Sequence, residues 1–279
     1  MPEPRIETNR TTPMRDASFR RPPPQDQADG LRRMFAASRP RFVAVASNPH
    51  VAFSGVLLER LTSAFATLGL KSIVVDASEN APEPNELAVV DLSVCIEPLS
   101  RDVAYLAARG LPLRHVDARG SSASFLQAVA DALPRADVVV MHAPASDLCR
   151  LFSRRAVRPV LMAADHPTSV THAYGAMKLL AVRNGLMSYD LLLSADPQSP
   201  RRDRIAEQLS SCADRFLGAV LRDSAVIDPA SDVDDVPTAE LLRLAHALLG
   251  SEDDPAEAPE LRAAHPYSPV WPAAAMTRN

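Results

Sequence analysis

The chain has 279 residues, 47% of them hydrophobic, with a formal net charge of −4 and an isoelectric point near 6.0. This length can bury one large core or two small ones, and the charge balance argues against a nucleic-acid-binding surface. Cys95, Cys149 and Cys212 lie far apart in no metal-type spacing, which favours reduced thiols in a cytoplasmic protein. We identify no signal peptide and no apolar stretch of transmembrane length.

Both ends of the chain have compositions typical of disorder. Residues 1–24 are rich in Pro, Arg and Thr, and residues 251–279 are acidic and then rich in Pro and Ala. Neither segment can bury much apolar surface, so we predict a disordered arm at 1–24 and a disordered tail at 251–279.

Residues 25–38 have the pattern of a short amphipathic helix. Asp26 is a suitable N-cap, and Leu31, Met34 and Phe35 form an apolar stripe. Such a helix could pack back onto its own domain, or it could dock into a partner's groove, anchored by Leu31 and Arg32. The spacing leaves both alternatives open.

Strands and helices alternate over residues 41–250. The apolar run at 41–47 is typical of a buried central strand, and a helical pattern follows at 54–69, ending at Gly69. We expect Ser or Asp, at 146 or 147, to cap a later helix. The pattern also predicts strands at 72–78, 111–118 (a weaker one), 136–144, 159–165, 189–196 and 225–228, and helices at 124–134, 146–155, 167–184, 200–218 and 237–250.

This alternation predicts an α/β fold, in which a mostly parallel sheet is covered by helices on both faces, in three layers and one domain. Ligands of such folds bind at the carboxyl ends of the strands. Here the predicted strands end at Ser47, Asp76, His142 and Asp165.

The loop after the first strand has the sequence SNPHVAFSG and occupies the place where many α/β proteins bind a phosphate. Phosphate loops need glycines that expose backbone amides, a lysine that neutralises charge, and a Ser or Thr hydroxyl for Mg²⁺. This loop has no lysine, and Pro49 removes a backbone donor. Phe53 either fills the phosphate space or belongs to a contact surface. The residues of this degenerate loop are Ser47, Asn48, Pro49, His50, Val51, Phe53, Ser54 and Gly55.

The acidic positions of a nucleotide site are also altered. The strand at 136–144 ends in His142, where an aspartate that acts through Mg²⁺ is expected, and a neutral imidazole cannot replace that carboxylate. We interpret His142 as a polar residue at a strand end, since no second ligand is spaced to form a metal site with it. Asp76 is either a surviving acid or a structural cap. We predict no metal site and no binding of ATP or Mg²⁺.

The segment Asp26–Arg32, DQADGLR, resembles the D-Q-A-x-x-L-R motif of the FlhG family, also called FleN. These proteins are MinD/ParA-like ATPases that control flagellar number and placement. Residues His166 to Leu180 resemble the family's P-T-S-V-T-D-A-Y-x-x-x-K helix, with His172 in place of its aspartate. The resemblance covers residues 25–249 and implies a MinD/ParA-like, P-loop NTPase-like fold.

The same resemblance aligns the loop with the family's K-G-G-x-G-K-T motif without gaps. Pro49 stands at the signature lysine, and residues 53–55 stand for the final Gly-Lys-Thr. Asp76 matches the first aspartate of the family's D-A-D, whereas His142 replaces the aspartate of its I-D-T-P/G motif. The resemblance therefore carries fold and biological context better than it carries an ATPase.

By resemblance, the N-terminal helix engages an SRP-type, FlhF-like GTPase and stimulates its GTP hydrolysis. Relatives also contact the flagellar switch or a transcription regulator, and the sequence does not choose among these partners. The partner-binding residues implied by the motif are Asp26, Gln27, Ala28, Leu31 and Arg32.

The family dimerises around ATP and binds the membrane through a C-terminal amphipathic helix. The acidic segment after residue 250 would be repelled by anionic lipid, so we expect weak or no membrane binding. Without the signature lysine we expect a monomer, cytoplasmic or peripheral at the cell pole. The favoured function is a non-catalytic flagellar regulator. The alternatives are a divergent ATPase using Asp76, Ser54 and His142, and a degenerate MinD/ParA relative serving cellulose export or pilus placement.

Overall fold

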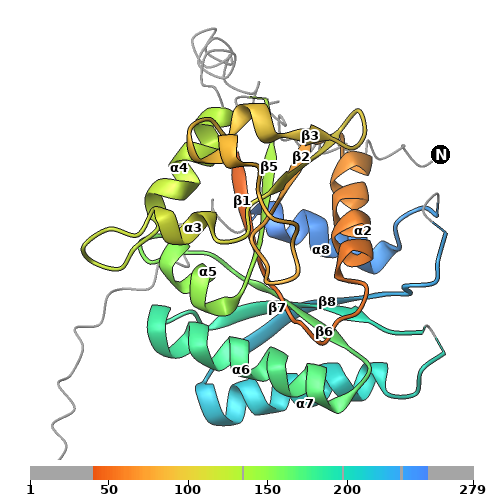
Figure 1. The fold of residues 1–279 in the computed structure, drawn as a ribbon. Coiled ribbons are helices and arrows are strands. Elements are labelled where there is room, and N and C mark those ends of the chain that lie inside the picture. The colour runs from red at the N-terminus through yellow and green to blue at the C-terminus, as the bar shows by residue number, and fades with distance from the viewer. Residues whose placement is uncertain (1–39, 134, 197, 233–234, 251–279) are drawn as a thin grey trace, which may run out of the picture. The chain divides into compact units, whose positions relative to one another are not determined.

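The structure is a computed structural model, which describes residues 40–250 except 134, 197, 233 and 234 (Figure 1). The predicted arm at 1–24, the predicted docking helix at 25–38 and the predicted tail at 251–279 lie outside these residues.

A single sheet forms the centre of the described part. Its eight strands follow the order β3-β4-β2-β5-β1-β6-β7-β8, and every neighbouring pair is parallel except β3 with β4. The mostly parallel sheet is therefore confirmed. The strands are β1 Arg41–Ala46, β2 Ser72–Asp76, β3 Glu97–Pro98, β4 Val103–Ala107, β5 Val138–Ala143, β6 Val160–Ala164, β7 Ser188–Ser194 and β8 Val220–Ile227.

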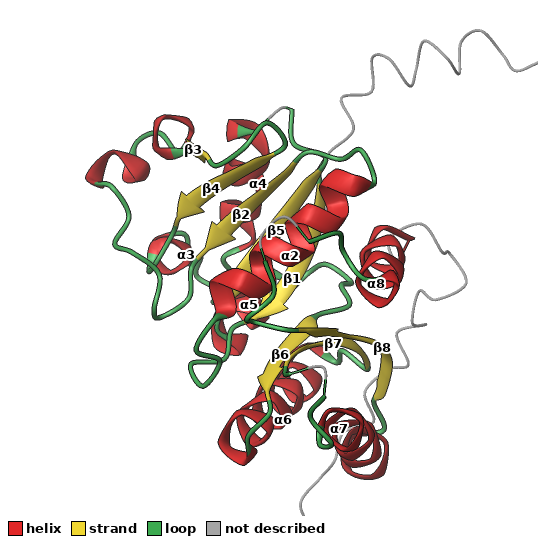
Figure 2. Ribbon diagram, turned by 90° about the vertical axis from the view of Figure 1, so that its right-hand side faces the viewer, coloured by secondary structure: helices red, strands yellow, loops and turns green. Residues whose placement is uncertain are grey.

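Helices cover both faces of this sheet, as the alternating pattern predicts. One face packs against α2 and α8, and the other packs mainly against α4, α5, α6 and α7 (Figure 2). The three-layer arrangement is confirmed. The helices are α2 Ser54–Thr67, α3 Leu111–Arg114, α4 Ala123–Ala132, α5 Ala145–Leu151, α6 Pro167–Asn184, α7 Arg202–Leu217 and α8 Ala239–Gly250, with short 3-10 helices η1 Glu86–Val89 and η2 Ser93–Cys95.

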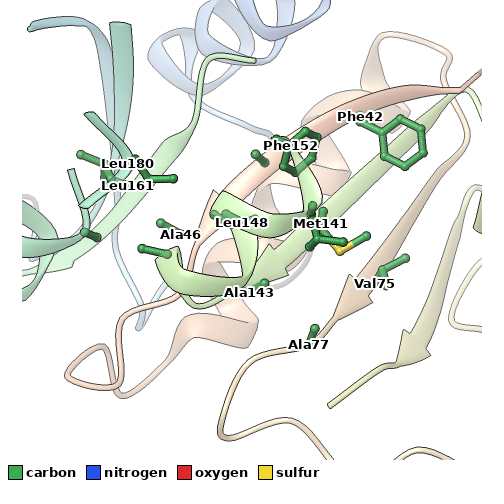
Figure 3. Packing of buried hydrophobic residues seen from close by; sticks show 14 of the residues in the cluster. Phe42, Ala46, Val75, Ala77, Met141, Ala143, Leu148, Phe152, Leu161 and Leu180 are labelled. Atoms are coloured by element: carbon green, nitrogen blue, oxygen red, sulfur yellow. The ribbon is translucent and has the colours of Figure 1, made fainter. Parts of the chain in front are cut away.

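The central strand β1 supplies side chains to two separate apolar layers. Val43 and Val45 face the layer beneath α2 and α8, whereas Phe42, Ala44 and Ala46 face the layer beneath the other helices. Alternation along a strand produces this division, and burial on both faces explains why the β1 sequence is continuously apolar. Figure 3 shows the second layer where α5 lies over β5.

The strand expected at 111–118 is wrong. Gly110 takes a left-handed backbone with φ +74°, and Pro112 lies in the first turn of the short helix α3 that follows. The strand that pairs with β2 is instead β4, whose sequence is VAYLA. Only Leu106 of β4 is fully buried, so this strand lacks the strong apolar signal of the central strands.

Two element boundaries also differ from those expected. Helix α5 starts after Pro144, which makes no side-chain capping bond, so Ser146 and Asp147 lie inside the first turn and do not cap it. Asp147 instead pairs with Arg150, one turn along, at 2.8 Å. The strand expected at 225–228 is longer, because β8 begins at Val220 and lies at the sheet edge, where polar residues are tolerated.

None of the helices in the described ranges is long and apolar enough to span a bilayer.

The α2 layer provides a test of the packing. Leu61 of α2 is fully buried, whereas Leu68, at the end of the same helix, is 38% exposed. We expect Leu61→Ala to lower the free energy of unfolding by about 2–5 kcal/mol, because it leaves a cavity in the core. Leu68→Ala is the matched control and should cost much less, as measured by urea denaturation. Equal losses in the two variants would contradict this account of the layer.

Candidate functional site

The carboxyl ends of the central strands surround a cavity of about 310 Å³. Its wall comprises the loop after β1, the segment after β2, the end of β5 with the start of α5, and one side of α6. Ser47, Asn48, Pro49 and Ser54 of the predicted loop line it together with His142. The structure therefore brings the loop and the altered acidic position to one site.

Asn48 fixes the loop after β1. Its side chain is buried, and Nδ2 donates to the carbonyl oxygens of Met162 and Ser169, both at 2.9 Å, and to Ser169 Oγ at 3.0 Å. Asn48 Oδ1 accepts from the backbone N–H of His50 at 3.1 Å. Since Met162 belongs to β6 and Ser169 to α6, these bonds tie the loop to two neighbouring elements.

The two apolar residues of the loop have different environments. Val51 is 3% exposed and packs in the core layer beneath α2, whereas Phe53 is 58% exposed at the N-cap of α2. Phe53 therefore does not fill the phosphate space. The other alternative, a contact surface that includes Phe53, stays a prediction.

Asp76 and His142 form a pair across β2 and β5. The register of the parallel strands sets them opposite each other, and His142 Nδ1 lies 2.9 Å from Asp76 Oδ1. The hydroxyl of Tyr105 donates to Asp76 Oδ2 at 3.3 Å, and the backbone N–H of Ser78 donates to Oδ1 at 3.0 Å. His142 is only 2% exposed, so it is a buried hydrogen-bonding partner as well as a polar residue at a strand end.

The pair sets the protonation of the site. Burial by itself raises the pKa of Asp76, but the hydrogen bond and charge of His142 and the contacts with Ser78 outweigh it, so the pKa lies below its ordinary value of 3.8. Burial and the neighbouring Asp76 charge raise the pKa of Tyr105. The carboxylate is therefore ionised at neutral pH, and it both accepts from Ser78 and pairs with His142.

The cavity has little positive charge with which to hold phosphates. Among its lining residues in the described ranges, none is lysine or arginine. Lys71 precedes β2 at the opposite end of the sheet. Arg60 on α2 donates to the Asp235 carbonyl at 3.2 Å and to Ser231 Oγ at 2.9 Å, in the segment before α8.

Three histidines gather beside the cavity, and the sequence did not predict this grouping. The ring of His50 lies 5.7 Å from that of His172 and 6.4 Å from that of His166, between centroids. Burial, and then the nearby His50, lower the pKa of His172. Within the described residues, no group of three His, Cys, Asp or Glu side chains is arranged to hold a metal ion.

The remaining predicted residues lie elsewhere. Asp165 follows β6, but it accepts a hydrogen bond from Ser199 and does not line the cavity. Gly55 lies in the first turn of α2 and also does not line the cavity. The predicted partner-binding residues, Asp26, Gln27, Ala28, Leu31 and Arg32, fall outside the described residues.

The fold has close counterparts among solved structures. The chain is similar to the MinD cell division protein of Aquifex aeolicus, with a TM-score of 0.50 and 14% identity, over 75% of this chain and 97% of that one. It is similar to a putative plasmid partition protein of Borrelia burgdorferi bound to AMPPNP, with a TM-score of 0.52 and 10% identity, over 76% and 98%. The fold is therefore a MinD/ParA-like, P-loop NTPase-like fold.

The sequence adds a more specific relationship. The chain is similar to the antiactivator FleN of Pseudomonas aeruginosa, with 33% identity over 109 residues. The match spans 38% of this chain and 38% of FleN, and no family model matches the chain.

The Asp76–His142 pair makes stability depend on pH. Because the pKa of Asp76 is lower in the folded chain than when unfolded, its carboxylate stabilises the fold above pH 3.8, and this contribution is lost as pH falls through the folded value. We expect Asp76→Asn to cost about 1.5–3 kcal/mol at pH 7, and the difference from wild type to shrink at acid pH.

Urea unfolding of both proteins at several pH values measures this difference. Asp214→Asn on the exposed side of α7 is the control for removing a carboxyl group from the surface. A difference between wild type and Asp76→Asn that grows as the pH falls would contradict the assignment.

Proposed function

We propose that the chain is a FleN-like regulator of flagellar number or placement, which acts through contacts with other proteins and has lost ATP binding. The observation that carries this proposal is the composition of the cavity wall, where no lysine or arginine occurs among the described lining residues. The similarity to FleN, named an antiactivator, supports a regulatory role.

Electrostatics argue against a triphosphate in this cavity. Phosphoryl groups in such proteins are held by cations and by backbone amides that point toward them. Here Glu79 lines the wall, and the ionised Asp76 lies behind the lining residue His142, with which it pairs. Like charges at close range repel each other strongly in a partly buried site. A nucleotide would have to bring its own cations into a negatively charged pocket.

The loop geometry supports the same conclusion. A phosphate loop wraps its backbone amides around the ligand. Here Asn48 anchors the loop to β6 and α6, Pro49 has no amide hydrogen, and Val51 is committed to the core. Opening this loop around a ligand would break several buried hydrogen bonds.

One feature favours a second candidate, a divergent ATPase. Asp76 and His142 are paired, and Ser54 lines the same cavity as His142, so the three residues of that hypothesis are close to one site. They offer an acid, an imidazole and a hydroxyl, but none supplies the charge of the missing lysine. The nucleotide experiment below separates the two candidates.

The partner side of the proposal rests on the DQADGLR motif. An amphipathic helix can dock on a GTPase without using a nucleotide site of its own. We propose an SRP-type, FlhF-like GTPase as the partner, at the cell pole, with the flagellar switch and transcription regulators as further candidates. Weak membrane binding and a monomeric state belong to the same proposal.

Nucleotide binding is the direct test. We expect isothermal titration calorimetry to show no binding of ATP or ADP with Mg²⁺, and about 5 mM ATP to leave the melting temperature unchanged. The Borrelia partition protein, whose structure holds AMPPNP, is the positive control. A ligand present at 100 times its Kd would add about 2.7 kcal/mol of stability, which a thermal scan detects. Such a shift would overturn the proposal, and ATP turnover abolished by Asp76→Asn would establish the divergent ATPase.

The motif can be tested on the partner's activity. We expect Leu31→Ala with Arg32→Ala to abolish stimulation of GTP hydrolysis by an FlhF-like GTPase, because both anchors of the docked helix are removed. Met14→Ala with Arg15→Ala removes one apolar side chain and one arginine outside the motif and should leave stimulation unchanged. Stimulation that survives in the first variant would refute this role of the motif.

A further inference from the structure

The segment of the chain that connects β2 to β4 exposes several large apolar side chains. Leu87, Val89, Val90, Val94 and Leu99 are 57%, 55%, 87%, 62% and 63% exposed. We call these five residues the edge patch. Single exposed apolar residues are common, but a concentration of them in one short segment marks an interaction surface.

The edge patch is held in place by its own segment. Between the exposed residues, two side chains are buried in the main core: Ala88 within η1 and Leu92 at the N-cap of η2. Asn85 Oδ1 accepts from the backbone N–H of Leu87 at 2.9 Å, and Asp91 Oδ1 accepts from that of Ser93 at 2.9 Å. The outward positions of the apolar residues therefore follow from fixed turns and buried anchors.

The same segment is acidic. Between Ser72 and Ser100 the sequence contains no lysine or arginine. The carboxylates of this segment that flank or interrupt the edge patch include Glu86, Asp91 and Glu97, and Glu83 pairs with Arg109 of a neighbouring loop at 2.7 Å. A partner that covers this surface would be attracted by positive charge around an apolar centre.

The adjacent sheet edge indicates how such a partner binds. The edge strand β3 has only two residues, and one of them is Pro98. A short edge strand containing proline is a poor template for adding another strand. The contact must therefore be made through side chains, as an amphipathic helix makes it.

We propose that the edge patch docks a helical segment of a partner protein, with one apolar face flanked by lysine or arginine. This contact is separate from the DQADGLR motif and does not depend on the nucleotide cavity. It gives the folded domain a protein-binding surface of its own.

The test uses the full chain and two fluorescently labelled synthetic helices of about 18 residues, about 27 Å long. Both carry leucines at the same helical positions, and their polar positions are lysine in one and glutamate in the other. We expect the basic helix to bind, with an affinity that weakens as salt is added, and the acidic helix not to bind. Fluorescence anisotropy measures both dissociation constants.

Variants then locate the binding site. We expect Val90→Ser with Val94→Ser to weaken binding of the basic helix roughly tenfold or more. Val182→Ser with Val236→Ser removes the same side chains from positions that are 74% and 81% exposed, and should leave the affinity unchanged. Glu86→Gln with Glu97→Gln should weaken binding and flatten its salt dependence.

Three results would overturn the proposal. The first is no saturable binding of the basic helix, and the second is an equal loss of affinity in the Val182 and Val236 control. The third is a concentration-dependent dimer in analytical ultracentrifugation that Val90→Ser with Val94→Ser abolishes, since the edge patch would then bind a second copy of the chain. Each measurement is independent of ATP binding and of GTPase stimulation.

Discussion

The burial of β1 and β5 on both faces is the constraint on which the rest of the structure depends. Two helical layers exclude water from these strands, so their backbone groups must pair within the sheet and their side chains must be apolar. Polar side chains of these strands can then lie only at the strand ends. Asp76 and His142 reach each other because β2 and β5 end at the same level, and Asn48 reaches Ser169 because the loop after β1 lies beside α6.

Charge distinguishes this cavity from a phosphate site more clearly than shape does. The cavity sits where the fold class binds ligands, at the carboxyl edge of a parallel sheet. The carboxylate of Asp76 pairs with His142, which lines the cavity, and Arg60 of α2 donates to the segment before α8. A loop can change sequence and keep its path, but cations supply much of the binding energy of a triphosphate site, and this difference in charge is the basis of the proposed loss of ATP binding.

The sequence could predict elements whose pattern is local and strong. The run at 41–47 and the helix at 167–184 were correctly predicted, because continuous burial and a proline at the helix start leave clear traces in the residues. β4 was missed because a half-buried strand of five residues has no such trace. The Asp76–His142 contact joins positions 66 residues apart, and the Asn48–Ser169 contact joins positions 121 apart. Both depend on strand register and loop path, which a single sequence does not specify.

The hydrogen bonds of Asn48 have a consequence for regulation. A ligand can switch a protein only when it binds two conformations with different affinities. When a loop is disordered without its ligand, the ligand supplies the contacts that order the loop. The ordered conformation then binds the ligand with higher affinity than the disordered one. Here the contacts are internal, since Met162 and Ser169 already satisfy the Asn48 amide. Under the proposed function, a loop fixed in this way keeps the protein-binding surfaces of the domain in one form. Control of the proposed regulator would then lie in its amount and in competition among its partners, and a nucleotide cycle would have no conformational difference to act on.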